Sequence, residues 1–314
     1  MARPWLCVAM PVHDGASLLD ATLQSVAVQE TRGIELRIYD SSPEPDCKPI
    51  VEKYRDRLII EYRHMPDVKP WTTKTNLAVA HTDAPHVVML HQDDLWLDGH
   101  AAALRQCLAD NPQAVMSVGP SRFVDRLGRD RGQWSTPCRK GMHPGHEFGR
   151  RLIVQNFLAI PSPVVARDAW LRVGGLEDGL WYTADWDLYL KLCRAGDIAV
   201  RDCATTAFRI HGGSLTMTGS RDENALRSQH QEVLGRHADA FGINSDKALG
   251  RRADASVAVN CALASLASGR VSAVGTLVRQ ISSLGPVECL RYMRESRLVD
   301  RVLPRLRARI AGDL

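Results

Sequence analysis

The sequence predicts an α/β fold in which a mostly parallel sheet is flanked by helices. Apolar strand patterns alternate with helical patterns along the first 100 residues, as in sheets covered by helices on both faces. Two expected strands end in acids, Asp40 and the pair Asp93–Asp94, and ligands bind beyond the carboxyl ends of strands in such sheets. Hydrophobic residues make up 45% of the 314 residues, which is enough for a large core.

The elements of this first part follow from local patterns. Apolar runs predict strands at 6–11, 35–40, 58–62 and 87–91. The spacing of Ser17 and Asp20 indicates a helix start, and Leu19, Leu23 and Val26 follow at helical intervals. Further helices are expected at 49–54, 75–80 and 98–110.

The second part of the chain is less regular and then becomes helical. Short strands are expected at 115–118, 198–201 and 206–210. Ser220 and Glu223 have capping-box spacing, so a helix should run from there to about His237. Three helices should follow Ala253, separated by Gly269 and by Gly285-Pro286. We therefore expect an α/β domain over residues 1–240 and a helical extension over 241–314.

Charge and motif content exclude several classes of protein. Residues 251–314 hold 11 arginines, no lysine and five acids, a net of +6, so the total of +4 leaves −2 for residues 1–250. A negative main domain disfavours nucleic acid as a partner. The chain lacks the P-loop, G-x-G-x-x-G, G-x-S-x-G and H-E-x-x-H patterns, which removes the usual NTPase, dinucleotide dehydrogenase, serine hydrolase and zinc protease classes.

The cysteines and the N-terminus favour a cytoplasmic protein. Eight scattered cysteines without a C-x-x-C pair fit reduced thiols better than a disulfide framework. The N-terminal segment does not have the pattern of a secretory signal, and no run of 18 apolar residues could span a membrane.

The Asp93–Asp94 pair is the first candidate site. Adjacent carboxylates at the end of a buried strand repel each other and resist burial, and a divalent cation removes both problems. Mn²⁺ and Mg²⁺ prefer oxygen ligands and often bind one or two carboxylates plus substrate phosphates. The alternative is that both acids cap the next turn or face water. Asp40 could accept a hydrogen bond from a base or ribose, or simply form a turn.

A second group of candidates follows a glycine-rich loop. Trp181, Asp185, Trp186 and Asp187 lie at the start of an expected helix, and either acid could cap it or act as a base facing a sugar. Arg209 and His211 end another short strand. Taken alone, Arg209 would more often be a charge on the protein surface. His211 would more often be a histidine whose hydrogen bonds are satisfied within the fold.

Eight segments share their order and spacing with one known pattern. They are Pro11–Asp14, Leu19 to Gln29, Ile38–Asp40, Thr75–Ala80, His91–Trp96, Val173–Leu176, Ala184–Leu190 and Arg209–His211. Together they resemble the family 2 inverting glycosyltransferases of the GT-A fold, from Leu6 to about Thr216, or about two thirds of the chain. Residues 1–240 would then be the GT-A catalytic domain.

The resemblance implies an activity and residue roles. The enzyme would move a sugar from a nucleotide-diphosphate donor, most often a UDP-sugar, to a hydroxyl of a glycan or lipid-linked acceptor in bacterial polysaccharide or glycolipid biosynthesis. Asp185 would be the general base, and Asp94, His211 and Asp93 would hold Mn²⁺ or Mg²⁺. The donor would be bound by Pro11, Val12, His13, Asp14, Asp40, Lys74, Asn76, Asp93 and Arg209, and the acceptor side formed by Trp181, Trp186 and Asp187.

Three positions depart from the family pattern. Ser41-Ser42 replaces the usual residues after Asp40, Gln92 precedes the acid pair, and Ala184 stands where a Glu usually precedes the base. A non-catalytic relative that only binds a nucleotide or sugar is therefore an alternative, supported by Ala184 alone. A nucleotidyltransferase is the other, although the first strand lacks the Gly-rich basic phosphate loop that such enzymes usually have.

The basic C-terminal segment has two explanations. Residues 294–310 place Leu298, Val302, Leu306 and Ile310 four apart beside a stripe of Arg297, Arg301, Arg305 and Arg309, with a kink expected at Pro304. Such a helix can lie on the inner face of an anionic membrane as a peripheral contact. It can equally pack on the catalytic domain, or on a second subunit of a homo-oligomer, with a solvated arginine face.

Overall fold

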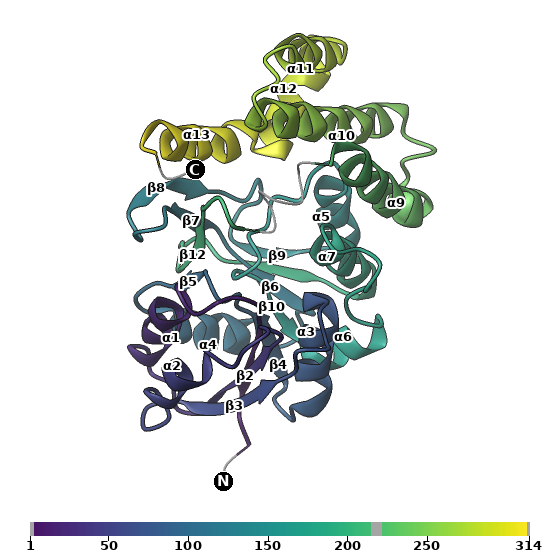
Figure 1. The fold of residues 1–314 in the computed structure, drawn as a ribbon. Helices are drawn as coiled ribbons and strands as arrows, with labels where there is room; N and C mark the ends of the chain where they lie inside the picture. Colours follow the sequence, from purple (N-terminus) through teal and green to yellow (C-terminus); the bar gives the residue numbers. More distant parts are fainter. Residues whose placement is uncertain (1–2, 215–221, 313–314) are drawn as a thin grey trace.

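The computed structural model describes residues 3–214 and 222–312 and contains two sheets covered by helices (Figure 1). The larger sheet has the strand order β3-β2-β1-β4-β10-β6-β11-β9, and the smaller one β5-β12-β7-β8. The strands of the first are β1 Leu6–Val12, β2 Ile34–Asp40, β3 Ile59–His64, β4 His86–Met89, β6 Met116–Val118, β9 Gly141–His143, β10 Val164–Ala166 and β11 Ile198–Val200. Those of the second are β5 Leu95–Trp96, β7 Ser121–Val124, β8 Asp130–Trp134 and β12 Thr206–Arg209.

The predicted α/β class is confirmed, with a mainly parallel sheet. β1 runs parallel to β2 and β4, β2 to β3, and β6 to β11, whereas β10 lies antiparallel between β4 and β6. Val12 pairs with Asp40, so β1 and β2 end at the same edge of the sheet. The residues after these strands are thereby brought together.

Both faces of the larger sheet are buried, which explains the apolar sequence of β1. Leu6, Val8 and Met10 belong to a core cluster with α1 (Leu19–Ala27) and α2 (Lys48–Glu52), and the alternate residues Cys7 and Ala9 belong to the other cluster. That second cluster also contains residues of the C-terminal helices, such as Val259 and Tyr292. The helical extension and the sheet therefore share one core.

Most helices lie where the sequence patterns predicted them, but those at 145–152 and 167–172 were not expected and some helix starts differ. The remaining helices before the extension are α3 Trp71–His81, α4 His100–Asp110, α5 Gly145–Leu152, α6 Arg167–Arg172, α7 Ala184–Ala195 and α9 Glu223–Phe241. The N-cap of α1 is Leu18, without a side-chain cap, so the capping role expected for Ser17 is wrong. The N-cap of α9 is Asp222, which accepts hydrogen bonds from the amides of Asn224 and Ala225, and Ser220 lies outside the described residues.

The extension contains one helix more than the three that were expected. They are α10 Lys247–Ala267, α11 Ala273–Ser282, α12 Gly285–Ser296 and α13 Leu298–Ile310. Arg297 has a left-handed backbone with φ of 49° and divides the segment that was expected to be one helix over 294–310. α13 lies across β8, whereas α11 and α12 lie at the far end of the molecule (Figure 1). The division of the chain after residue 240 remains a prediction.

No helix in the described ranges is both long and apolar enough to cross a bilayer. The peripheral membrane contact suggested for residues 294–310 also remains a prediction. The burial of side chains along α13 bears on this prediction. Arg301 of its arginine stripe is buried, whereas Leu306 and Ile310 are exposed.

Candidate functional site

A cavity of about 1100 Å³ opens between the carboxyl ends of the strands and the C-terminal helices. Asp93, Asp94 and Asp185 all line it, although more than 90 residues separate the pair from the third acid. They are the only acids that line it within the described residues. The structure thus gathers the metal candidates and the candidate base at one site.

The acid pair is held by backbone and side-chain contacts from β12. Arg209 donates from its backbone amide to Asp94 Oδ1 at 3.0 Å and from Nε to the carbonyl of Asp93 at 2.7 Å. Nε2 of His211 lies 2.8 Å from Asp93 Oδ2. Burial and the neighbouring Asp93 raise the pKa of Asp94 well above its usual range. Burial opposes ionisation of Asp93 too, but the His211 hydrogen bond prevails and lowers its pKa.

These residues fit a divalent cation whose remaining ligands come from a substrate. Asp94 is 1% exposed and faces the cavity. The neighbouring carboxylate of Asp93 makes ionisation of Asp94 unfavourable. A cation would remove that penalty. Within the described ranges no three His, Cys, Asp or Glu side chains cluster into a closed metal site. A site of one or two carboxylates completed by phosphate oxygens is the arrangement Mg²⁺ and Mn²⁺ commonly adopt.

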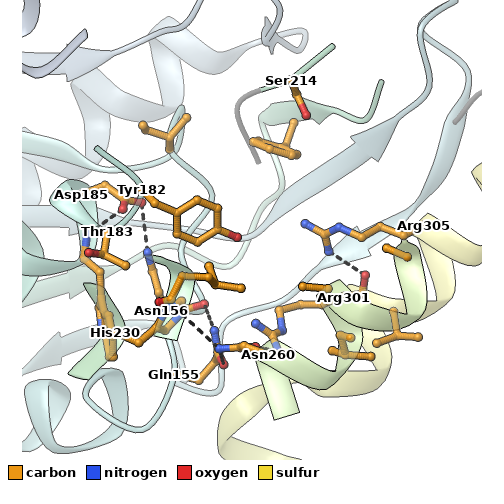
Figure 2. A pocket seen from close by; sticks show the side chains of 18 of the residues that line it. Gln155, Asn156, Tyr182, Thr183, Asp185, Ser214, His230, Asn260, Arg301 and Arg305 are labelled. Atoms are coloured by element: carbon orange, nitrogen blue, oxygen red, sulfur yellow. Dashed lines mark hydrogen bonds between the residues drawn. The ribbon is translucent and has the colours of Figure 1, made fainter. Parts of the chain in front are cut away.

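Asp185 lies in the first turn of α7, on the cavity wall (Figure 2). Its Oδ2 accepts from Asn156 Nδ2 at 3.0 Å, and its Oδ1 accepts from the Trp186 amide at 2.8 Å. Both bonds favour the charged form, but burial outweighs them and raises the pKa of Asp185 to about 6. A carboxyl with that pKa is mostly ionised at pH 7 and is a stronger base than a solvated Asp.

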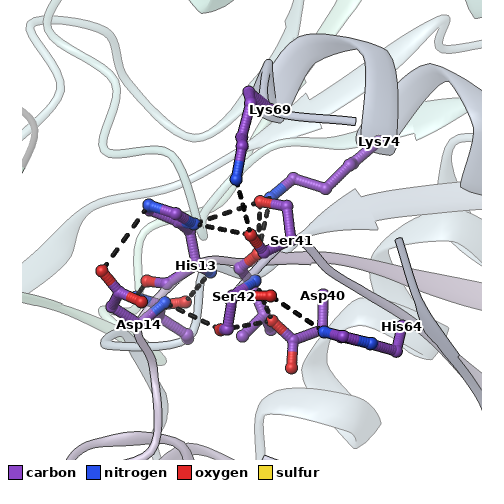
Figure 3. A network of polar contacts seen from close by, with 10 residues as sticks. His13, Asp14, Asp40, Ser41, Ser42, His64, Lys69 and Lys74 are labelled. Atoms are coloured by element: carbon purple, nitrogen blue, oxygen red, sulfur yellow. Dashed lines mark hydrogen bonds and ion pairs between the residues drawn. The ribbon is translucent and has the colours of Figure 1, made fainter. Parts of the chain in front are cut away.

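The residues after β1 and β2 form a polar network beside a second cavity of about 610 Å³ (Figure 3). His13 and Asp14 line that cavity with His211. His13 Nδ1 lies 3.0 Å from the carbonyl of Ser41, and the Asp14 amide donates to Ser42 Oγ at 2.9 Å. Pro11 and Val12 are buried beneath these residues at the end of β1, and the donor-binding role of the loop stays a prediction.

Gln92, one of the three departures, joins this loop to the acid pair. Its Oε1 accepts from the His13 amide and its Nε2 donates to the His13 carbonyl, both at 2.7 Å. A carboxylate could accept the first bond but could not donate the second. The amide therefore holds the loop after β1 in register with the segment of the acid pair, without adding a third negative charge.

Asp40 and Lys74 lie inside the fold rather than on a cavity wall. Asp40 is 0% exposed and accepts from the Ser42 amide at 2.8 Å and from the Tyr62 hydroxyl at 2.8 Å. Lys74 Nζ donates to the Val12 carbonyl at 2.5 Å, and burial lowers its pKa to about 8. Both side chains stabilise the loop from beneath, and the expected contact of Asp40 with a base stays a prediction.

Three further expected contacts are structural ties here. Asn76 donates to the Leu176 carbonyl at 2.8 Å and accepts from the Leu176 amide at 3.0 Å, which fixes the loop before α7. Asp187 is 0% exposed, pairs with His237 at 2.9 Å and Lys191 at 2.7 Å, and lines neither of the two cavities. Arg209, already described, positions the acid pair instead of lining a cavity.

Trp181 and Trp186 line the large cavity as expected, and other lining residues were missed. Asn156, which holds Asp185, belongs to a loop without a motif. Tyr182 separates Asp185 from Arg301 and Arg305 of α13 (Figure 2). The arginines were noticed as a helical stripe, but nothing in their spacing indicated which surface the stripe would face.

The fold and the acids around its cavity define a glycosyltransferase of the GT-A type. The chain belongs to glycosyl transferase family 2, whose sequence pattern matches residues 7–172. Among curated proteins, no sequence matches it significantly.

Solved structures show the same fold at low sequence identity. S. aureus TarS 1–349 is 14% identical, with 88% of each chain covered and a TM-score of 0.57. The same protein in complex with UDP-GlcNAc is 15% identical, with the same coverage and TM-score. The mannosyltransferase PcManGT from Pyrobaculum calidifontis, in complex with GDP-Man and Mn²⁺, is 16% identical over 98% of this chain and 88% of that one, with a TM-score of 0.56.

Proposed function

We propose that this glycosyltransferase moves a sugar from a UDP-sugar to an acceptor hydroxyl in a single displacement that inverts the anomeric carbon. The observation that carries the proposal is the shared cavity of Asp94 and Asp185, a buried acid pair at one wall and a raised-pKa carboxyl at another. The acceptor would be a glycan or a lipid-linked glycan of bacterial polysaccharide or glycolipid biosynthesis.

Asp185 would take the proton from the attacking hydroxyl. Asn156 and the Trp186 amide keep its carboxylate oriented, and burial keeps it basic. Positioned general bases of this kind contribute about 10²–10⁴-fold to rate. Ala184 is 0% exposed, so the missing neighbouring acid leaves Asp185 as the single carboxylate at this wall.

The donor diphosphate would lie between the loop after β1 and the acid pair. His13, Asp14 and His211 line the space there, and Asp93 and Asp94 would hold Mn²⁺ or Mg²⁺. A bound divalent ion neutralises negative charge on a leaving diphosphate. The complexes of the similar structures with UDP-GlcNAc and with GDP-Man and Mn²⁺ support a nucleotide-sugar donor and a divalent cation.

Donor hydrolysis tests this proposal without knowledge of the acceptor. Purified protein is incubated with UDP-hexoses and Mn²⁺, UDP release is measured, and NMR identifies the anomer of the freed sugar before it equilibrates. Inversion of an α-linked donor by water should yield the β-sugar first. Asp94→Ala should abolish metal-dependent donor binding, whereas the exposed Asp254→Asn should not. Release of the α-sugar, or UDP release that does not respond to metal, would refute the proposal.

A further inference from the structure

The large cavity has an acidic wall and a basic wall. Its acids are those of the candidate site, and its basic residues come from the extension: Arg270, Arg301, Arg305 and Arg309. Figure 2 shows Asp185 and the arginines on opposite sides of the Tyr182 ring. A molecule that reaches from Asp185 across Tyr182 would therefore meet Arg301 and Arg305.

Arg301 and Arg305 are held by neutral groups alone. Arg301 is 8% exposed, donates to Asn260 Oδ1 at 3.2 Å, and has a buried Nε without a hydrogen-bond partner. Arg305 donates to the Arg301 carbonyl at 2.7 Å, and its guanidinium lies 5.1 Å from the centre of the Phe123 ring and 5.8 Å from that of Trp134. Within the described residues, no carboxylate forms an ion pair with either side chain.

The two cations also repel each other. Burial lowers the pKa of Arg301, and burial together with Arg301 lowers that of Arg305 to about 10. Placing two like charges side by side in a partly dry site is costly unless an anion joins them. Among the residues that the structure describes, no counter-charge accompanies this pair of cations.

Arg252 is one buried arginine of this fold that is held by acids. It lies on α10, is 5% exposed, and pairs with Glu288 and with Glu295, the latter at 3.1 Å. The acid of α13, Asp300, pairs with Arg297 rather than with Arg301 or Arg305.

A single buried arginine of this fold can lack an acid partner. Arg201 is 6% exposed and donates to the Ser162 carbonyl and the Thr205 hydroxyl. Arg301 and Arg305 differ from Arg201 because they are two neighbouring cations that line a cavity, where a ligand can supply the counter-charge.

We propose that Arg301 and Arg305 bind a phosphate ester carried by the acceptor, across the cavity from Asp185. This inference rests on the proposed function, because it takes the cavity as the place where an acceptor hydroxyl meets its base. Paired guanidiniums match the several oxygens of a phosphate group with bidentate hydrogen bonds. Neither arginine lines the second cavity, where the donor diphosphate is expected, so the two phosphate sites are separate.

The phosphate can belong to a soluble polyol phosphate or to a lipid, and two probes distinguish these sources. sn-Glycerol 3-phosphate, with glycerol as the neutral control, is titrated by calorimetry in metal-free buffer with EDTA. Vesicles of phosphatidylglycerol, with phosphatidylcholine as control, are tested by flotation. Binding of glycerol 3-phosphate alone indicates a soluble source, and flotation with phosphatidylglycerol that depends on the arginines indicates a lipid.

The variant Arg301→Gln/Arg305→Gln should weaken phosphate-probe binding about tenfold or more. Arg294→Gln, an exposed arginine of α12 outside the cavity, should bind as the wild type does. Arg301→Lys keeps the positive charge and should bind the phosphate probe more tightly than the double variant does. That result would show that the weaker binding of the double variant is not due to misfolding. The proposal is overturned if neither probe binds, or if the double variant binds as tightly as the wild type.

UDP binding is measured by thermal shift on the same protein preparations, in buffer that contains Mn²⁺ and no EDTA. A wild type that binds UDP but neither phosphate probe refutes the acceptor subsite and leaves the proposed function intact. A wild type that binds glycerol 3-phosphate through the arginines but not UDP refutes the donor assignment instead.

Discussion

Asp185→Asn should make the protein more stable and, at the same time, inactive. A carboxyl group whose pKa rises from 3.8 to about 6 on folding destabilises the folded protein when it is ionised. Two pKa units correspond to at most about 3 kcal/mol. The asparagine side chain of the variant can still accept the hydrogen bond from the Trp186 backbone amide. Its NH₂ group, however, would face the NH₂ group of Asn156, and the loss of that hydrogen bond costs about 1 kcal/mol. The net gain expected at pH 8 is about 2 kcal/mol.

The sign of this effect depends on pH in a way that the experiment can follow. Because the folded-state pKa is raised, the penalty is absent below the unfolded pKa of 3.8 and complete above about 6. The variant should therefore exceed the wild type in urea denaturation at pH 8 and fall about 1 kcal/mol below it near pH 4, where only the cost of the opposed amide groups remains. For a chain of this size, the gain corresponds to a Tm increase of about 4 °C.

Activity is measured as UDP release at pH 8. Turnover by Asp185→Asn should be about 10²–10⁴-fold lower than that of the wild type. Asp254→Asn on the exposed side of α10 controls for the loss of one acid. Full activity in Asp185→Asn would refute the base assignment. A stability gain that is the same at pH 4 and pH 8 would refute the electrostatic argument, since ionisation could not then be its cause.

Three other outcomes are expected. UDP release by the wild type should rise with pH and be half-maximal near pH 6, because Asp185 must lose its proton, and a rate profile from pH 5 to 8 measures this. Asn156→Leu removes a hydrogen bond to the charged carboxylate and should move that midpoint to higher pH; an unchanged midpoint would contradict the role given to Asn156. Arg252→Met removes the cation that pairs with Glu295 and leaves Glu288 with Arg291 alone, so it should lower the unfolding free energy by about 3 kcal/mol in urea, whereas a shift below 1 kcal/mol would count against the pairing.

The sheet and the acid pair could be predicted because local patterns determine them. β1 is apolar at every position since both of its faces are buried, and this is visible in its sequence. Acids after parallel strands must meet at one edge, so Asp93 and Asp94 were placed without tertiary information. Asp187 shows a limit of that reasoning. It lies two residues after Asp185 on α7, about 200° around a helix of 3.6 residues per turn, so both could not face one cavity.

The remaining differences arise from contacts between distant segments. Asn76 bonds to Leu176, one hundred positions away, and no local pattern reports such a partner. A helical stripe of arginines indicates an amphipathic helix but not which face of it meets the protein. Leu298 and Val302 of the apolar stripe pack on the core beside buried Arg301, whereas Leu306 and Ile310 stay exposed. The apolar stripe alone therefore does not determine how this helix is oriented.

The aromatic stack under Arg305 gives the protein an optical signal of its own. Trp134 lies parallel to Phe123, with ring centres 5.0 Å apart, and the charge of Arg305 sits beside both rings. Indole emission responds to the electric field of a nearby cation. Any molecule that draws that guanidinium away from the rings will change the fluorescence of Trp134, so occupancy at this end of the cavity can be followed in solution without a label.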